Sequence, residues 1–334
     1  MKLSRKSVRV CLSSIYLPLR NFLIRIGFLR LRTKYRLFAW KIERVFFNTL
    51  CRKKKVCIFT RHASNSGLLA VFRYFLGGIA YADRRGLLPV IDMKNTPNAY
   101  LFDDEVGHVN AWEYYFTQPS GISLEEAERS NEALSLQVDK FPVPRQDIST
   151  FLNRNGELDY WRDICRRYIH FSRPVLEALE REQAKFTGKK VLGVSLRGTD
   201  YVMLKIHDHP VQPSTEQVIA KASEVMASQN YDALYLSTED KNIAEEFKNV
   251  FGDKLLLPEG EFIDYTPSAE KWITMYSTHR DNDKYLMGLE YLVSKLALTK
   301  CDGLITSMTN GTVIVMCLSE GFDYLHVFDL GLYP

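Results

Sequence analysis

The chain has 334 residues, of which 46% are hydrophobic and 25% are charged. These proportions are typical of a soluble globular protein and exclude long disordered regions, and the length accommodates two domains of ordinary size. The formal net charge of +4 conceals an asymmetry, because residues 1–55 carry a net charge of +15 and the remaining residues carry −11. A basic arm on an acidic body indicates a segment that localises the protein.

The cysteines and the absent glycine motifs exclude several classes of protein. The six cysteines show neither CxxC spacing nor histidine partners. This pattern disfavours a zinc site or a disulfide scaffold and predicts a reducing, cytoplasmic location. The sequence contains no GxGxxG, P-loop or GxSxG motif. The sequence therefore lacks the usual motifs for dinucleotide binding, ATP hydrolysis and serine-hydrolase chemistry.

The basic arm combines apolar and cationic residues. Residues 8–29 are mainly apolar, but three arginines and Pro18 interrupt them. Neither a membrane-spanning helix of about 20 residues nor a cleavable signal peptide is therefore expected. Apolar and basic residues interleave from residue 19 to residue 47, which predicts a basic amphipathic helix on an anionic membrane surface. The alternatives are a helix packed on the body of the protein and an RNA-binding arm.

The body begins with a strand, a helix and a second strand. Residues 56–60 are an apolar run that predicts a buried strand, and a polar turn follows at residues 61–67. Apolar residues at helical spacing predict a helix over residues 68–85, and residues 87–91 predict the next strand. Such a βαβ unit is parallel and right-handed.

The middle of the chain is less regular. Residues 93–155 contain loop signals and a helix that starts at Ser123, with Glu126 in capping-box spacing. Residues 158–186 predict one long helix that connects two halves of the protein.

The second half alternates strands and helices, which is typical of an α/β domain with a doubly wound parallel sheet. Short apolar runs predict the strands, and amphipathic stretches between them predict the helices. The expected strands are residues 191–196, 231–237, 254–257, 303–306 and 324–328, and the expected helices are residues 215–228, 238–251, 284–299 and 311–319.

Polar residues cluster after three of these strands, at the ends where open α/β sheets bind ligands. Hydroxyl groups, glycine and backbone N–H groups at a helix start bind phosphate, and an arginine contacts phosphate with a fork of donors. The same residue types are good helix caps, so a purely structural role is the alternative. The residues concerned are Arg197, Thr199 and Asp200 after the first strand, Ser237 and Thr238 after the second, and Ser307, Thr309, Asn310, Gly311 and Thr312 after the fourth.

Two other motifs point only weakly to a metal. His207 and His209 would need further ligands, and a polar loop is the preferred interpretation. Residues 281–283, Asp-Asn-Asp, have the DxD pattern of metal-dependent glycosyltransferases. They precede a helix instead of following a strand, which indicates helix capping. We therefore expect no metal site.

Residues 195–200, Ser-Leu-Arg-Gly-Thr-Asp, resemble the His-x-Arg-x-Thr/Gly-Asp motif of the superfamily that contains the α-1,6- and protein O-fucosyltransferases. Residues 289–312 resemble the last donor-binding motif of that superfamily, and residues 327–333 resemble its bacterial members. The resemblance covers about residues 190–334. In the first half it depends on the turn at residues 65–67.

The resemblance implies a GT-B-like α/β fold, in which two Rossmann-type domains with parallel sheets face each other. It also implies inverting transfer from GDP-fucose without a metal or cofactor. The basic helical arm would occupy residues 1–55, an acceptor-side domain residues 56–157, a connecting helix residues 158–188 and the nucleotide-sugar-binding domain residues 189–334.

The resemblance also implies roles for single residues. Arg197 would neutralise the β-phosphate as GDP departs, and Asp200 would orient Arg197 or contact the acceptor. A leaving diphosphate needs such charge stabilisation, which an arginine and a helix N-terminus supply. Ser307, Thr309, Asn310 and Gly311 would hold the diphosphate or the nucleoside. The acceptor side would comprise Asn65, Gly67, His207 and Asp208, and the general base would be Asp200, His207 or Asp208.

The sequence therefore predicts a cytoplasmic glycosyltransferase on the inner face of the membrane, held there by residues 1–50 and acting on a polysaccharide or glycolipid acceptor. Ser195 stands where the superfamily has a histidine, and Ser294, with Glu290 one turn earlier, lies near the expected base-reading acid. These two positions motivate the alternatives, a transferase for another nucleotide sugar or a non-catalytic sugar-nucleotide- or glycan-binding protein. No nucleic-acid recognition motif is present in the body.

Overall fold

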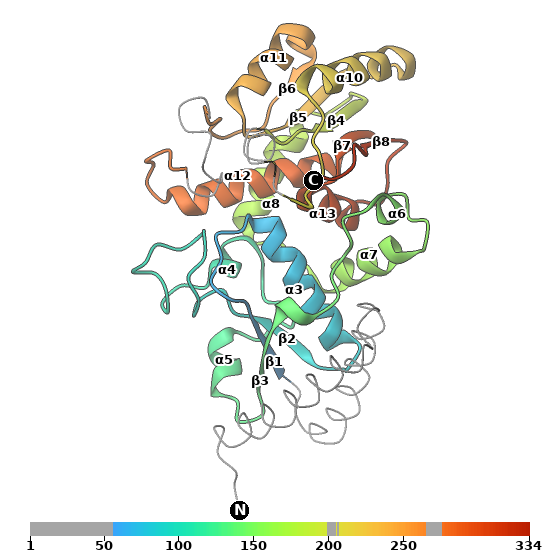
Figure 1. Ribbon diagram of the computed structural model, residues 1–334. Coiled ribbons are helices and arrows are strands. Elements are labelled where there is room, and N and C mark those ends of the chain that lie inside the picture. The colour runs from blue at the N-terminus through green and yellow to red at the C-terminus, as the bar shows by residue number, and fades with distance from the viewer. Residues whose placement is uncertain (1–55, 199–204, 206, 265–275) are drawn as a thin grey trace, which may run out of the picture. The chain divides into compact units, whose positions relative to one another are not determined.

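Two parallel β-sheets organise the part of the chain that the computed structural model describes, which is residues 56–198, 205, 207–264 and 276–334 (Figure 1). The predicted basic arm over residues 1–55 lies outside the described residues, and so do Thr199 and Asp200. From Lys55 onwards the chain forms one unit. No helix within the described ranges has both the length and the apolar character needed to cross a bilayer.

The first sheet has the strand order β2–β1–β3, and both strand pairs are parallel. Its strands are β1 (Val56–Thr60), β2 (Leu88–Ile91) and β3 (Leu134–Gln137). Helix α3 (Leu68–Asp83) connects β1 to β2 and confirms the predicted βαβ unit. Because α3 is apolar on nearly all sides and buried over most of its length, it is an interior helix of this half.

Short helices occupy the connections of the first half. The capping box predicted at Ser123 is present, since its hydroxyl accepts from the Glu126 N–H and the Glu126 carboxylate accepts from the Ser123 N–H. The short helices are α4 (Ala111–Tyr115), α5 (Leu124–Arg129), the 3₁₀ helix η2 (Val138–Lys140) and α6 (Ile148–Phe151).

The second sheet has the order β6–β5–β4–β7–β8, again with every pair parallel. The central strands β4, β5 and β7 are fully buried, as strands covered by helices on both faces should be. The strands are β4 (Val191–Ser195), β5 (Ala233–Ser237), β6 (Leu255–Leu256), β7 (Gly303–Ser307) and β8 (Tyr324–Phe328), and the helices are α10 (Thr215–Gln229), α11 (Lys241–Phe251), η3 (Gly252–Lys254), α12 (Asp283–Leu298) and α13 (Asn310–Leu318).

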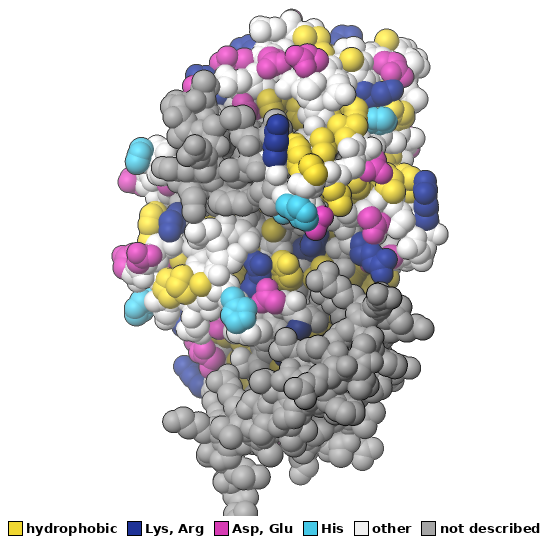
Figure 2. Space-filling model, in the orientation of Figure 1, with side chains coloured by type: hydrophobic (Ala, Val, Ile, Leu, Met, Phe, Trp, Pro, Cys, Tyr) yellow, Lys and Arg dark blue, Asp and Glu magenta, His cyan; other side chains and the backbone are white. Residues whose placement is uncertain are grey.

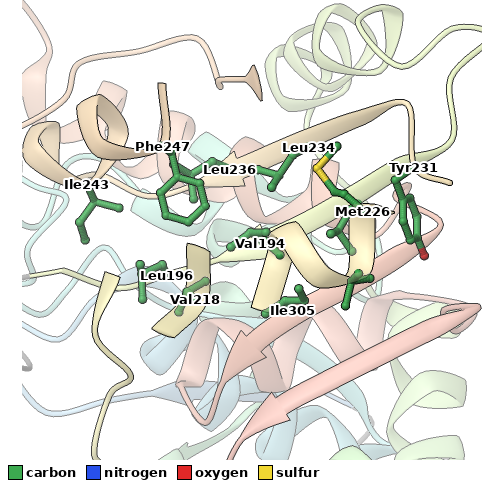
Figure 3. Close-up of a cluster of buried hydrophobic side chains, with 13 residues drawn as sticks. Val194, Leu196, Val218, Met226, Tyr231, Leu234, Leu236, Ile243, Phe247 and Ile305 are labelled. Carbon is green, nitrogen blue, oxygen red and sulfur yellow. The ribbon is translucent and has the colours of Figure 1, made fainter. Parts of the chain in front are cut away.

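One face of the second sheet carries a continuous apolar core (Figure 3). Val194, Leu236 and Ile305 contribute to it from the three central strands, and Val218 of α10 and Phe247 of α11 cover them. Each fully buried aliphatic or aromatic side chain of this kind contributes roughly 1.5–3 kcal/mol relative to an exposed one. This core fixes the sheet whose carboxyl edge carries the predicted site.

The predicted α/β class with two parallel sheets is confirmed, and so is the type of nearly every predicted element. The long helix over residues 158–186 is wrong, because the structure has two helices there, α7 (Glu157–Tyr168) and α8 (Arg173–Ala184). Between them Phe171 forms a bridge with Phe116, a partner that local spacing cannot reveal. Pro174 lies in the first turn of α8, where its missing N–H breaks no helical hydrogen bond, and it marks the new helix start.

The sequence also fails to predict β3, a four-residue strand that is partly exposed. It forms by pairing with β1, from Cys57 opposite Leu134 to Thr60 opposite Gln137. The cysteines of the described ranges, Cys57, Cys165, Cys301 and Cys317, are all buried, as is common for cysteines that act as small apolar residues.

The two halves meet where α4 packs on α12. The Tyr115 hydroxyl donates to the Tyr285 carbonyl at 3.1 Å, and the two rings are stacked with 6.0 Å between their centroids. Gly288 lies against this tyrosine so closely that a Cβ would overlap the Tyr115 hydroxyl. A further contact joins the Gln146 amide to the Met308 carbonyl at 2.7 Å. These contacts hold the two halves together.

We expect Gly288→Ala to lower the free energy of unfolding by about 1–3 kcal/mol, because Tyr115 is fully buried and has no room to move away. Urea denaturation measures this change. The control is Gly67→Ala, at the N-cap of α3, where an added Cβ meets no atom within 4 Å; it should cost at most about 0.5 kcal/mol. Equal stabilities for the two variants would contradict the proposed packing.

Candidate functional site

A pocket, here called the strand-end pocket, lies at the carboxyl ends of β4 and β5 and encloses about 800 Å³ including its open mouth. Residues from both halves of the protein line it, which places it between the two sheets. The lining consists of Gly67, Ala99 and Tyr100 from the first half, Arg197, Thr238 and Glu239 from the strand ends, residues 258–263, Thr278, Arg280, and Met287, Glu290, Tyr291 and Ser294 of α12.

Strand β4 delivers Arg197 to this pocket. The residues before it are buried, and the next residue, Gly198, lies directly on the Asp240 side chain, which leaves no space for a Cβ. Asp240 in turn caps α11, because its carboxylate accepts from the N–H groups of Asn242 and Ile243 at 2.9 and 3.3 Å. The backbone beside Arg197 is therefore held against the start of the neighbouring helix.

The polar residues at the end of β5 form hydrogen bonds within the protein, line the strand-end pocket, or do both. The Thr238 hydroxyl accepts from the Asp240 N–H at 3.2 Å, and the Ser237 hydroxyl donates to Ser294 of α12 at 3.1 Å. Glu239 lines the pocket and is only partly buried. The sequence pattern predicts donor-binding roles for Ser237 and Thr238 but not for Glu239, although Glu239 lies in the same turn.

The end of β7 makes mostly internal hydrogen bonds. Thr309 caps α13 by accepting from the Thr312 N–H at 3.1 Å, and the Thr312 hydroxyl donates to the Ser307 carbonyl at 2.9 Å. The Ser307 hydroxyl donates to the Gln212 side chain. These three hydroxyl groups are buried and bond within the protein. They therefore have the purely structural role that the sequence pattern leaves open as the alternative.

The first turn of α13 nevertheless keeps unused donors. In the described part of the chain, the backbone N–H groups of Asn310 and Gly311 have no acceptor. The buried side-chain oxygen of Asn310 likewise has no donor among the described residues. Such N–H groups, with the positive end of the helix dipole, favour an anion. Ser307, Thr309, Asn310, Gly311 and Thr312 do not line the strand-end pocket, but Gly311 lies next to Tyr291, which does.

Lys295 of α12 is a buried charge at the same edge of the sheet, and it is not among the predicted site residues. Its ammonium group donates to the Ser195 hydroxyl at 3.1 Å and to the Ser237 carbonyl at 3.4 Å. Burial lowers its pKa to about 8, the Glu239 carboxylate acts in the opposite direction, and the Arg197 charge lowers it further. Lys295 is the single charged residue of residues 292–298, which are otherwise apolar except for Ser294, and this is the signal that would have revealed it.

A bidentate ion pair forms another wall of the strand-end pocket. Arg280 contacts both carboxylate oxygens of Glu290, at 2.6 and 3.0 Å. Glu290 is the acid one turn before Ser294, near the expected base-reading position, and its carboxylate is thus engaged by Arg280. Asp283 holds the segment that carries Arg280, because it accepts from Ser277, from Thr278 and from the Arg280 guanidinium.

The DxD segment does not cap α12 as predicted. Asn282 is the N-cap residue, in the left-handed region at φ 57°, and makes no side-chain capping bond. Asp283 bonds backward to residues 277–280, and Asp281 is exposed. Among the described residues, no group of three or more His, Cys, Asp or Glu side chains is arranged to hold a metal ion.

The predicted acceptor-side residues are not gathered in one place. Gly67 lines the strand-end pocket, whereas Asn65 is exposed and is not part of its lining. His207 and Asp208 are exposed, with 3.4 Å between the imidazole Nδ1 and the carboxylate, and the Asp208 N–H donates to the Tyr333 carbonyl. Neither lines the strand-end pocket, and Thr199 and Asp200 lie outside the described residues.

A second pocket, here called the aromatic pocket, shares Tyr100 with the first. Its aromatic lining consists of Tyr100, Phe102, Tyr114 and Tyr285, and it also contains Glu105, Glu113, Pro174, Asn282 and Lys284. The Phe102 side chain is 42% exposed. Burial raises the pKa of Tyr114 to about 12, and so does Glu105, whose carboxylate accepts from the Tyr114 hydroxyl at 3.2 Å.

Comparison with known proteins gives matches among solved structures only. No family model matches the chain, and no curated protein matches it. A structure of NodZ α-1,6-fucosyltransferase soaked with GDP-fucose is similar at 13% identity, with a TM-score of 0.46, over 80% of this chain and 93% of that one. Fucosyltransferase NodZ from Bradyrhizobium gives 12% identity and 0.46 over the same shares. POFUT1 in complex with GDP-fucose gives 11% and 0.48, over 82% of this chain and 98% of that one.

We expect Asp283→Asn to destabilise the protein near neutral pH by about 1–3 kcal/mol, because it weakens the bonds that hold residues 277–280. Burial raises the pKa of Asp283, but the bonds from Thr278, Ser277 and Arg280 together lower it below the usual value. The stabilisation is therefore complete above the unfolded-state pKa of about 4 and is lost as the pH falls through the folded value.

Urea denaturation of both proteins at several pH values from about 3 to 7 measures this effect. The matched control is Asp281→Asn, which removes an exposed carboxylate two residues away. A stability difference between Asp283→Asn and the unmodified chain that does not shrink on acidification would show that the charge of Asp283 has no stabilising role.

Proposed function

We propose that the protein is a glycosyltransferase that binds a nucleotide sugar at the carboxyl edge of the second sheet. The observation that carries this proposal is Arg197, which a parallel strand delivers into the strand-end pocket. The unused N–H groups of α13 lie at the same edge of the sheet. A guanidinium and a helix N-terminus together suit a diphosphate.

The chemistry of sugar transfer explains why a diphosphate site needs these groups. As the bond from the sugar to the diphosphate breaks, negative charge develops on the leaving phosphate and positive charge on the sugar ring. Donors that are already in place stabilise the leaving group without reorganisation, and a strand-end arginine is such a donor. We propose that Arg197 takes this role, so that the leaving group needs no metal. That the transfer is inverting is a further proposal, which the motif resemblance implies.

GDP-fucose is the donor that the motif resemblance implies, and we propose it as the substrate. Thr199, Asp200, Ser237 and Thr238 would complete the diphosphate side, with Ser307, Thr309, Asn310, Gly311 and Thr312 forming or bracing the loop behind it. Because Ser237 and Thr238 are buried, they would act mainly by shaping the pocket floor. Asp200 would orient Arg197 or contact the acceptor.

We propose a polysaccharide or glycolipid as the acceptor. Sugars bind aromatic faces together with carboxylate and amide groups, and the aromatic pocket beside the donor site offers both. The predicted acceptor residues Asn65, Gly67, His207 and Asp208 remain proposals. For the general base we retain Asp200, His207 and Asp208, and add Glu239 because it lines the strand-end pocket with Arg197.

A nucleotide sugar is favoured over nucleic acid as the partner. On the face shown in Figure 2, basic and acidic side chains are interspersed over the described surface. Nucleic-acid binding depends on clustered cations, which the described part of this face does not present.

We expect Arg197→Ala to lower kcat for transfer or hydrolysis of GDP-fucose by about 10²–10³-fold, because one preorganised donor to the leaving group is lost. The measurement is GDP release from GDP-fucose, set beside a screen of GDP- and UDP-sugars. Arg173→Ala, which removes an exposed arginine on α8, is the control and should leave the rate unchanged. Unaltered turnover in Arg197→Ala would refute the proposed role. Donor binding without any turnover in the unmodified chain would favour the non-catalytic alternative.

We also propose that residues 1–50 hold the enzyme on the cytoplasmic face of an anionic membrane, near a lipid-linked acceptor. Removing these residues should release the protein from vesicles that contain anionic lipid, because apolar area and basic charge are lost together. Vesicle co-sedimentation measures this, with purely zwitterionic vesicles as the control. Undiminished binding of the shortened protein to anionic vesicles would rule out this role of the arm.

A further inference from the structure

Lys295 is a buried cation whose hydrogen-bond partners are neutral. The residue is 5% exposed, and its ammonium group bonds to the Ser195 hydroxyl and the Ser237 carbonyl. Among the residues that the structure describes, no carboxylate forms an ion pair with it. An ammonium group has three N–H donors, so one remains unassigned. Because a buried charge without a counter-charge is costly, the position of Lys295 requires an explanation other than packing.

The location of the ammonium group suggests where the counter-charge comes from. Ser195 and Ser237 are paired residues at the ends of β4 and β5, so Lys295 lies under the carboxyl edge of the sheet. Its side chain also reaches the start of α13, since a Cβ on Gly311 would lie 3.5 Å from Lys295 Cε. The ammonium group is therefore near the unused N–H groups of α13. Strand ends, a helix N-terminus and a buried cation meet at one point.

Within the described ranges, the charges around this point do not compensate that of Lys295 fully. Arg197 lies two residues after Ser195, and its positive charge disfavours the charged form of Lys295. Glu239, at the end of β5, favours the charged form. Among the described residues, two cations and a helix N-terminus face one carboxylate here, and this local balance favours a further anion. A diphosphate carries enough charge to interact with both cations at once.

We infer that Lys295 is the second cation of the anion site and holds the donor's diphosphate together with Arg197. Arg197 contacts the anion from the pocket wall, and Lys295 acts from beneath, through its charge and through the Ser195 hydroxyl that it orients. Lys295 is thus a positioning residue. The inference rests on the proposed function for the diphosphate being part of a nucleotide sugar, but it requires neither fucose nor guanine.

The test compares Lys295→Met with the unmodified full-length chain. Calorimetry measures the binding of three probes, inorganic pyrophosphate, GDP and guanosine. We expect the variant to bind pyrophosphate and GDP about 10- to 100-fold more weakly, because a charged interaction is lost, and to bind guanosine within about twofold of the unmodified chain. Without ligand its melting temperature should be unchanged or higher, because an uncompensated buried charge has been removed. Lys300→Met, which removes an exposed lysine just beyond α12, is the matched control.

The outcomes separate this inference from the proposed function. Unaltered pyrophosphate and GDP binding in Lys295→Met overturns the inference, and so does an equal loss for guanosine, which indicates a general role in shaping the pocket. If pyrophosphate binding depends on Lys295 but GDP-fucose is not a substrate, the anion site stands and the proposed donor is wrong. If the unmodified chain binds neither pyrophosphate nor any nucleoside diphosphate, both are wrong.

A measurement on the unmodified chain keeps the test decisive if Lys295→Met does not fold. Because the pKa of Lys295 is lowered to about 8, its charge is lost as the pH rises through that value. We expect pyrophosphate binding to weaken over this range, although pyrophosphate itself gains negative charge. Of the groups that the structure describes, those that face Lys295 are Arg197, Glu239 and the Tyr291 ring, and arginine and glutamate side chains keep their charge over this pH range. Constant or stronger binding overturns the inference.

Discussion

The site depends on the parallel register of β4 and β5, in which Ser195 lies opposite Ser237. Because both strands run in the same direction and end at the same level, the residues that follow them emerge at one edge of the sheet. Arg197 and Glu239 then line the same pocket, although 42 residues separate them. The residues that follow them, Gly198 and Asp240, fit closely against each other and fix the backbone at both strand ends. A shift of register by one residue would send each side chain to the other face.

The polar residues at this edge fall into two groups with different physical roles. The hydroxyl groups of Thr238, Thr309 and Thr312 bond within the protein, where they satisfy helix starts and strand ends. The charged side chains of Arg197 and Glu239 line the strand-end pocket, and Lys295 is buried at the same edge of the sheet. The hydroxyl groups therefore build the edge, and we propose that the charged groups give it an affinity for an anion. Buried hydroxyls that bond to each other keep such an edge rigid, which lets its charges act without reorganisation.

The contact between the two halves sets what can approach this edge. Tyr115 packs on Gly288 of α12, and the same helix carries Tyr291, Ser294 and Lys295 one to two turns further along. Tyr100, close to Tyr115, belongs to the walls of both pockets. One helix thus joins the proposed anion site to the interface between the halves. This arrangement suits a reaction in which a donor and an acceptor meet across a shared wall.

Several features of the protein are determined by its sequence alone. Apolar runs and helical spacing predict the parallel α/β architecture, and capping residues such as Ser123 mark helix starts, because these signals act within a few residues. The same logic predicts Arg197 at a strand end. Only the tertiary structure decides the break at Phe171, the pairing of β3 with β1, the Arg280–Glu290 pair and the burial of Lys295. Each of these depends on partners distant in the chain, and local spacing carries no information about such partners.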